Sequence, residues 1–155
     1  MSVPPLVLRP DAWDLPLFVH VAGAMVLMGA ALLAGVALAG GLRAAGSGQG
    51  ATLTRFGFRT LLIGALPAFI VMRVGAEWIA SEQEIEEPAW IGIGYITSDG
   101  GALFLVAGLI TAGIAQKRMG RGEAASGLTR AATILSLLLV VALLIALWAM
   151  SSKPL

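Results

Sequence analysis

The sequence contains no cysteine and a single histidine, His20, and its charged residues are scarce. Without cysteine, disulfides, thiol catalysis, zinc–thiolate sites and cysteine-ligated iron–sulfur clusters are excluded within this sequence. One histidine also excludes a multi-histidine metal site within one chain. Only 12% of the residues are charged, which is about half the share that is usual in soluble domains.

What the sequence has instead is apolar surface. Hydrophobic residues make up 58% of the 155 positions, and the mean hydropathy is +0.91. This composition indicates an integral membrane protein, because soluble domains contain roughly 45–50% apolar residues. Four spans of about 20 residues with short loops would use most of the sequence, so no room is left in it for a soluble catalytic domain. We therefore expect no enzymatic activity.

Four apolar stretches lie between polar segments, and each is long enough for a helix to cross about 30 Å of hydrocarbon. They cover approximately residues 15–41, 57–80, 99–116 and 131–150. The remaining segments are expected to be a flexible loop at 42–56, an acidic interfacial loop at 81–98 and a basic loop at 117–130. The predicted fold class is an all-α, integral membrane, four-transmembrane-helix bundle. Pro67 predicts a kink within the second span.

The third span is expected to begin at Asp99. Thr97, Ser98 and Asp99 carry side-chain oxygens that can accept hydrogen bonds from the free amide groups of a first helical turn. A longer span that began near residue 88 would place Asp99 near the middle of the bilayer, where a carboxylate is costly.

Basic residues concentrate in the loops that follow the first and third spans. Seven lie there and three lie on the other side: Arg43, Arg55, Arg59, Lys117, Arg118, Arg121 and Arg130 against Arg9, Arg73 and Lys153. The positive-inside rule then predicts that these loops are cytoplasmic and that both termini are extracytoplasmic. The four tryptophans agree, because they fall at the predicted outer ends of the spans. Arginine outnumbers lysine eight to two beside abundant Ala and Gly, which favours a GC-rich bacterium and its plasma membrane.

Small residues predict where the helices pack, since close backbone contact stabilises helix association in lipid. The first span carries several of them and the third span carries others, which makes these two spans the expected central pair and leaves the fourth span the most exposed to lipid. The candidate packing residues are Gly23, Gly29, Ala31 and Gly35 in the first span and Gly108 and Ala112 in the third.

Ionisable residues within spans are the candidate functional residues, because hydrocarbon tolerates them only when they are paired or hydrated. His20, Arg73, Glu77 and Asp99 are all expected within roughly the outer 10 Å of the membrane. Arg73 and Glu77 are four residues apart and can pair on one helix face. One interpretation is an outward-facing polar pocket with His20 as a proton acceptor. The other is purely structural: an Arg73–Glu77 pair, a capping role for Asp99, and a bond from His20 to a backbone carbonyl.

No cofactor or metal is expected. Met25 and Met28 do not share a helix face with His20, which disfavours a copper site, and a single histidine supplies only one axial ligand for haem. Nothing in the sequence indicates nucleic-acid binding.

The opening of the first span, LFVHVAGAMVLMGA at 17–30, resembles a broad set of bacterial four-helix membrane proteins that are loosely similar to the membrane domain of CopD-type copper-resistance proteins. The resemblance also includes the number of spans and the proline in the second span. It implies a four-helix membrane fold and marks His20, Gly23 and Gly29. The further histidines and methionine clusters of a copper carrier are not present in this sequence.

These observations favour a non-enzymatic binding or accessory subunit in the bilayer, with a membrane protein or a second copy of the chain as partner. Two alternatives remain. One is a small transporter or an ion-conducting oligomer, and the other is a membrane redox protein that binds haem or a metal at His20.

Overall fold

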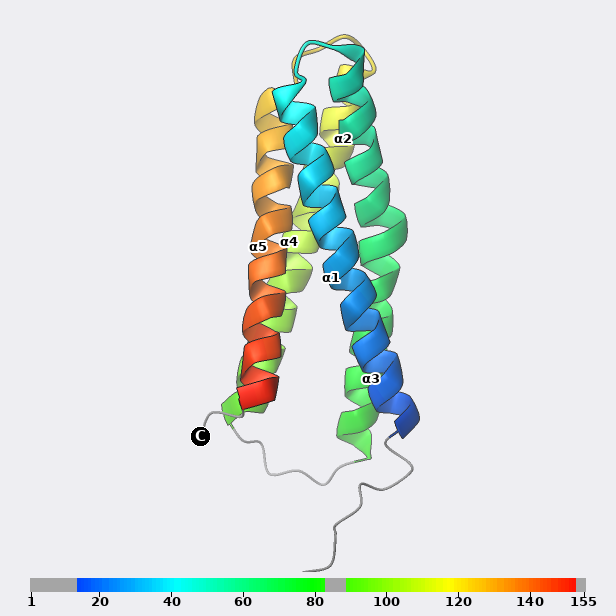
Figure 1. Ribbon diagram of the computed structural model, residues 1–155, viewed down its shortest axis with the longest axis vertical. Helices are drawn as coiled ribbons and strands as arrows, with labels where there is room; N and C mark the ends of the chain where they lie inside the picture. Colours follow the sequence, from blue (N-terminus) through cyan, green and yellow to red (C-terminus); the bar gives the residue numbers. More distant parts are fainter. Residues whose placement is uncertain (1–13, 83–88, 153–155) are drawn as a thin grey trace, which may run out of the picture.

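The computed structural model describes residues 14–82 and 89–152, and within these ranges the chain is helical apart from two short connections. The helices are α1 (Asp14–Arg43), α2 (Gly48–Thr60), the π-helical turn η2 (Leu61–Ala65), α3 (Leu66–Ser81), α4 (Ala89–Met119) and α5 (Ser126–Ser152). Since α2, η2 and α3 follow one another without a break, the described residues form four helical rods, each long and apolar enough to cross a membrane (Figure 1). Outside what the structure describes lie Arg9, Trp13, Lys153, the side chain of Trp90 and residues 83–88 of the expected acidic loop.

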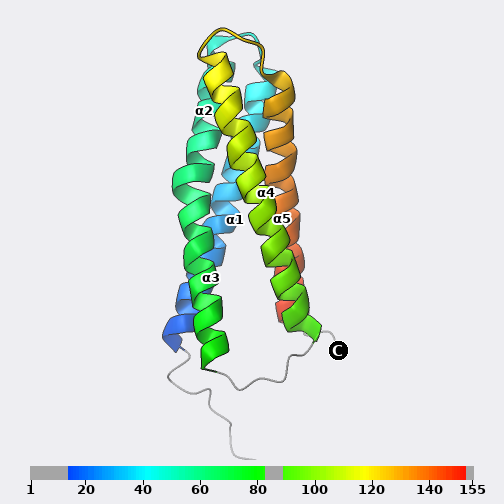
Figure 2. The ribbon, with the colours of Figure 1, turned by 180° about the vertical axis from the view of Figure 1, so that it is seen from behind.

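The four rods run up and down, and both described connections lie at one end of the bundle (Figure 1). We call this the basic end, and we call the opposite end, where α1 begins and α5 ends, the terminal end. Toward the terminal end the pair formed by α1 and α3 diverges from the pair formed by α4 and α5 (Figures 1 and 2).

The arrangement corrects two expectations about packing. The helix α1 packs on α2, α3 and α5, whereas α4 packs chiefly on α5 and also on α2. The first and third spans are therefore at opposite corners of the bundle and are not its central pair. The fourth span is not the most lipid-exposed either, because 33% of its most apolar window is buried compared with 22% for the second span.

Glycines allow α1 and the second span to approach closely. A Cβ atom at Gly23 would lie 2.6 Å from the backbone nitrogen of Met72, and one at Gly75 would lie 2.5 Å from that of His20. Near the basic end, a Cβ atom at Gly57 would lie 2.7 Å from Cγ of Leu38. Only hydrogen fits at these positions, so this contact between the first two spans depends on them.

The other expected packing residues give a mixed result. Ala31 and Ala112 are fully buried, Gly35 faces Ser136 and Leu137 of α5, and Gly108 faces Leu61 and Leu135. The expectation for Gly29 is wrong, because this residue is exposed and a Cβ atom there would meet nothing within 4 Å.

The expected flexible loop at 42–56 is mostly helix. After a short turn at 44–47, α2 begins at Gly48, and the Ser47 side chain accepts a hydrogen bond from the amide of Gly50. Ser47 is thus an N-cap, which satisfies one of the amide groups that a helix start leaves free. A Cβ atom at Gly50 would lie 2.4 Å from the carbonyl oxygen of Ala44, so glycine is needed at this turn because of the tight fold-back.

The third span begins ten residues earlier than expected. Residues 89–98, expected to belong to a loop, form the first turns of α4, and Asp99 lies inside the helix and does not cap it. Thr97 also does not cap, because its hydroxyl donates to the carbonyl oxygen of Ile93 at 2.7 Å within the same helix. At its other end α4 continues to Met119, and α5 begins at Ser126, so the basic loop is reduced to 120–125.

Pro67 is accommodated next to a π-helical turn. The amide of Leu66 donates to the carbonyl oxygen of Leu61, five residues earlier, and Pro67 follows directly. A proline has no amide hydrogen and crowds the carbonyl four residues earlier, and a π turn is one way in which a helix relieves that conflict.

Candidate functional site

The side chain of Arg73 connects α3 with α4 at the terminal end of the bundle. Its Nε lies 3.0 Å from Oε1 of Glu77, one turn further along α3, and its Nη1 lies 3.2 Å from Oδ1 of Asp99 on α4. The acidic partner expected for Arg73 is therefore present twice. We call Arg73, Glu77 and Asp99, with the two α4 residues described next, the Arg73 cluster.

Two further α4 side chains contact the guanidinium group. Nη1 donates to the hydroxyl of Ser98 at 3.5 Å, and Cζ lies 4.8 Å from the centroid of the Tyr95 ring. A guanidinium over an aromatic ring is attracted by the negative face of the ring. Tyr95, Ser98 and Asp99 reach one arginine because residues three and four apart share a helix face.

The cluster holds more negative than positive charge. One guanidinium faces two carboxylates, so the formal sum is −1. The side chain of Arg73 is 30% exposed, whereas those of Glu77 and Asp99 are 53% and 68% exposed. The guanidinium of Arg73 is thus partly covered by its partners, and the carboxylates of Glu77 and Asp99 form most of the exposed surface of the cluster. Such a surface attracts a cation and not an anion.

The cluster lies near one boundary of the apolar part of the bundle. Asp99 and Lys117 are 18 residues apart on the uninterrupted helix α4. At 1.5 Å per residue and 3.6 residues per turn, they lie on the same face and about 27 Å apart. This distance is close to the roughly 30 Å thickness of a hydrocarbon core. In a bilayer whose one boundary is at Lys117, Asp99 would lie at the other boundary, even though α4 extends ten residues beyond it.

His20 lies at the level of the cluster but in a different contact. Its Nδ1 lies 2.9 Å from the carbonyl oxygen of Met72, the residue before Arg73. Since a carbonyl only accepts, Nδ1 carries the proton and donates it. Met72 and Gly75 face α1, whereas Arg73 faces α4. The structure thus brings together Arg73, Glu77 and Asp99, and it places His20 in the contact between α1 and α3.

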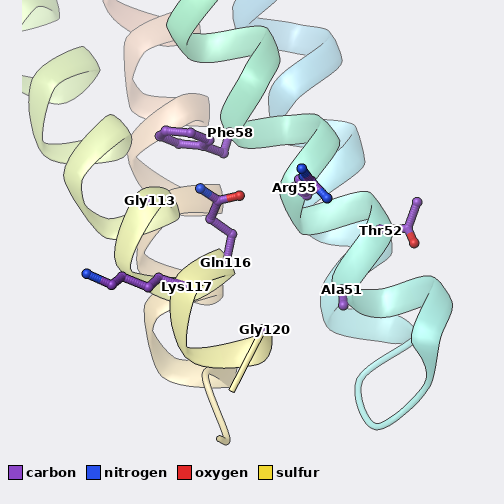
Figure 3. Close-up of a pocket in the computed structure, with 8 residues that line it drawn as sticks. All are labelled: Ala51, Thr52, Arg55, Phe58, Gly113, Gln116, Lys117 and Gly120. Carbon is purple, nitrogen blue, oxygen red and sulfur yellow. The ribbon is translucent and has the colours of Figure 1, made fainter. Parts of the chain in front are cut away.

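A groove at the basic end was not predicted from the sequence. It lies between α2 and α4, has a volume of about 500 Å³, and is lined partly by Arg55, Gln116 and Lys117 (Figure 3). From the sequence, Arg55 and Lys117 counted only as loop charges and Gln116 only as the end of the third span, because the helical structure of 48–56 was not predicted. A second, apolar groove of about 330 Å³ runs along Gly23 and Pro67 between α1 and the second span.

Within residues 14–82 and 89–152, no three His, Asp or Glu side chains lie close enough together to hold a metal ion. Comparison of the chain with models of known families, with curated proteins and with solved structures finds no match.

Proposed function

We propose that this chain is a non-enzymatic binding or accessory subunit of a bacterial plasma membrane, and that its Arg73 cluster binds a cationic group such as an ammonium or a guanidinium. The observation that carries the proposal is the excess carboxylate of the cluster, which is exposed where α3 and α4 diverge. The excess of basic residues at the opposite end favours an extracytoplasmic position for the cluster. The cation can belong to a solute or to a basic side chain of a membrane partner.

The interior of the bundle favours binding over transport. The buried polar side chains among the described residues are the hydroxyls of Thr54, Thr129, Thr133 and Ser136. Each donates to the carbonyl oxygen of the residue four positions earlier in the chain. These hydroxyls lie in α2 and α5, and between them and the Arg73 cluster the core is made of apolar residues such as Leu61, Leu105 and Leu139. A polar path through one chain is therefore not supported.

The test uses butylguanidinium and butylammonium, which carry the head groups of arginine and lysine. Full-length protein in phosphatidylcholine nanodiscs is titrated at constant ionic strength, and the thermal unfolding midpoint is followed. The expected result is a saturable rise for the wild type, because a ligand that binds only the folded state stabilises it. Asp99→Asn and Glu77→Gln each change the formal charge of the cluster from −1 to 0, so each should abolish the rise.

A variant that is expected to strengthen the response, and not to abolish it, adds a second test. Arg73→Gln leaves two carboxylates without their cation, so its response to butylguanidinium should be larger than that of the wild type. Glu123→Gln is the matched control, because it removes a carboxylate that pairs with Arg118 and Arg121 at the basic end. Its response should equal that of the wild type. No saturable response in the wild type, or an equal response in Asp99→Asn, would refute the proposal.

A further inference from the structure

The groove between α2 and α4 at the basic end combines two kinds of lining. Figure 3 shows Phe58 reaching from α2 toward α4 and Gln116 reaching from α4 into the space between the two helices. Arg55 lies on α2, farther toward the basic end than Phe58 and level with the Gln116 amide, whereas Lys117 lies on α4 with its side chain directed away from α2. The lining is thus apolar on the side of the bilayer and polar and basic on the side of the loops.

Among the residues that the structure describes, the two basic groups of the groove have no acidic partner. The ion pairs at this end of the described chain join Glu123 to Arg118 and Arg121. Neither Arg55 nor Lys117 forms an ion pair within residues 14–82 and 89–152, and both residues are exposed. The groove therefore offers the unneutralised guanidinium of Arg55, and the amide of Gln116 can donate further hydrogen bonds, while the unneutralised ammonium of Lys117 lies on the side of α4 away from α2.

The apolar part of the groove is open because of a glycine. Gly113 lies on α4 beside Phe58, and a Cβ atom there would lie 3.1 Å from Cε2 of the ring. Phe58 is partly buried and packs against the hydrophobic core. The Phe58 ring and Gly113 together form an apolar wall of the groove, next to its basic part and farther from the loops.

We propose that this groove binds the head group of an anionic phospholipid, with the phosphate beside Arg55 and the Gln116 amide, the charge of Lys117 adding to the attraction, and the start of an acyl chain along Phe58 and Gly113. The charges are complementary, and basic pockets between transmembrane helices are suited to anionic head groups. The depth also fits, since Lys117 lies about 27 Å from Asp99 along α4, at the other boundary of a bilayer. An apolar wall beside the cations distinguishes a lipid from a free phosphate ion.

The proposal is tested by native mass spectrometry of the full-length protein, with phosphatidylglycerol and phosphatidylcholine as probes. The wild type should bind one phosphatidylglycerol in preference to phosphatidylcholine. Arg55→Gln/Lys117→Gln should bind it roughly 30-fold more weakly, because each basic group near an anionic lipid contributes about fivefold. The isosteric Gln116→Glu should also weaken binding, because it places a carboxylate beside the phosphate without changing the shape of the groove.

Arg43→Gln/Arg130→Gln is the matched control. It removes two exposed basic residues from the same end that do not line the groove, and it changes the net charge equally. Its affinity for phosphatidylglycerol should stay within about twofold of the wild type, as expected for sites without shared partners. If the two double variants lost affinity for phosphatidylglycerol equally, the lipid would be attracted by the overall positive charge of this end and not bound by the groove. That result would overturn the proposal. Displacement of the lipid by an equimolar concentration of inorganic phosphate would also overturn it, in favour of a free-anion site.

Discussion

Arg73 on α3 and Asp99 on α4 form an ion pair, with 3.2 Å between Nη1 and Oδ1, across the end of the bundle where the two helices diverge. Glu77 binds the same guanidinium but belongs to the same helix. Of the two carboxylates, only Asp99 therefore ties α3 to α4. This difference between the two carboxylates gives a direct test of the role of the pair in the structure.

The first prediction is that Asp99→Asn loosens the terminal end whereas Glu77→Gln does not. Because the chain has no native cysteine, spin labels can be attached uniquely at Val74→Cys and Ile96→Cys, two exposed positions on α3 and α4. The distance distribution measured by pulsed electron resonance should become longer and broader in Asp99→Asn. The associated loss of stability should be about 0.6 kcal/mol, the average for polar contacts between membrane helices. Equal distributions in the two variants would show that the pair does not hold the helices.

The second prediction concerns the close contact between α1 and α3. Gly75→Ala should lower the free energy of unfolding by about 1–3 kcal/mol, as overpacking does, because the added methyl group meets the backbone of His20. Backbone atoms cannot move aside as a flexible side chain can. Gly29→Ala is the control on α1, where the methyl group meets nothing. It should be neutral or slightly stabilising, since alanine favours a helix over glycine. Unfolding in mixed detergent micelles measures both.

The third prediction separates the roles of His20. His20→Ala removes the donor to the carbonyl oxygen of Met72 and should cost about 1 kcal/mol of stability. His20→Asn carries an amide nitrogen at the same number of bonds from the backbone, so it should lose less. Neither variant should change the response to butylguanidinium, because His20 is in the contact between α1 and α3. Loss of that response in both variants, without loss of stability, would place His20 in the binding site.

The four apolar rods and the Arg73–Glu77 pair could be predicted because each depends only on the residues of a single helix and their spacing. Length and hydropathy define a span, and a spacing of four residues defines a shared face. The polar-pocket interpretation placed Arg73 and Asp99 in one cluster, but the ion pair between them was not specified, since Asp99 was also assigned to a cap. That assignment assumed that a helix begins at the membrane boundary. In the structure α4 begins ten residues before Asp99, so Asp99 lies inside a longer helix.

Helix neighbours were harder to predict, because small residues permit close contact without specifying the partner. Gly23 was correctly chosen, but its neighbour is Met72 on the second span and not a residue of the third. The glycine-rich composition of 44–52 suggested a flexible linker. In the structure one of these glycines, Gly50, lets α2 lie against the end of α1, and Ser47 caps the start of α2. A flexible linker and a close contact between helices both favour glycine, because both depend on the absence of a side chain. Composition alone therefore does not distinguish between them.

The fourth prediction concerns the orientation of the chain in the membrane. Among the described residues, the basic end carries seven basic residues and one acidic residue, Glu123, whereas Arg73 at the terminal end is surrounded by carboxylates. Short loops rich in arginine and lysine stay on the cytoplasmic side. Single cysteines at the exposed positions Gln49 and Ala124 should therefore react with a membrane-impermeant maleimide only after the cells are permeabilised.

A cysteine at Ser152, the exposed end of α5, should react in intact cells. The three positions are tested together because their sides of the membrane are linked. Two crossings separate Gln49 from Ala124, so these two must lie on the same side. One crossing separates Ala124 from Ser152, so Ser152 must lie on the other side. Labelling of Gln49→Cys and Ala124→Cys in intact cells, with protection of Ser152→Cys, would invert the orientation. The Arg73 cluster would then face the cytoplasm, and its proposed cationic ligand would have to be a cytoplasmic one.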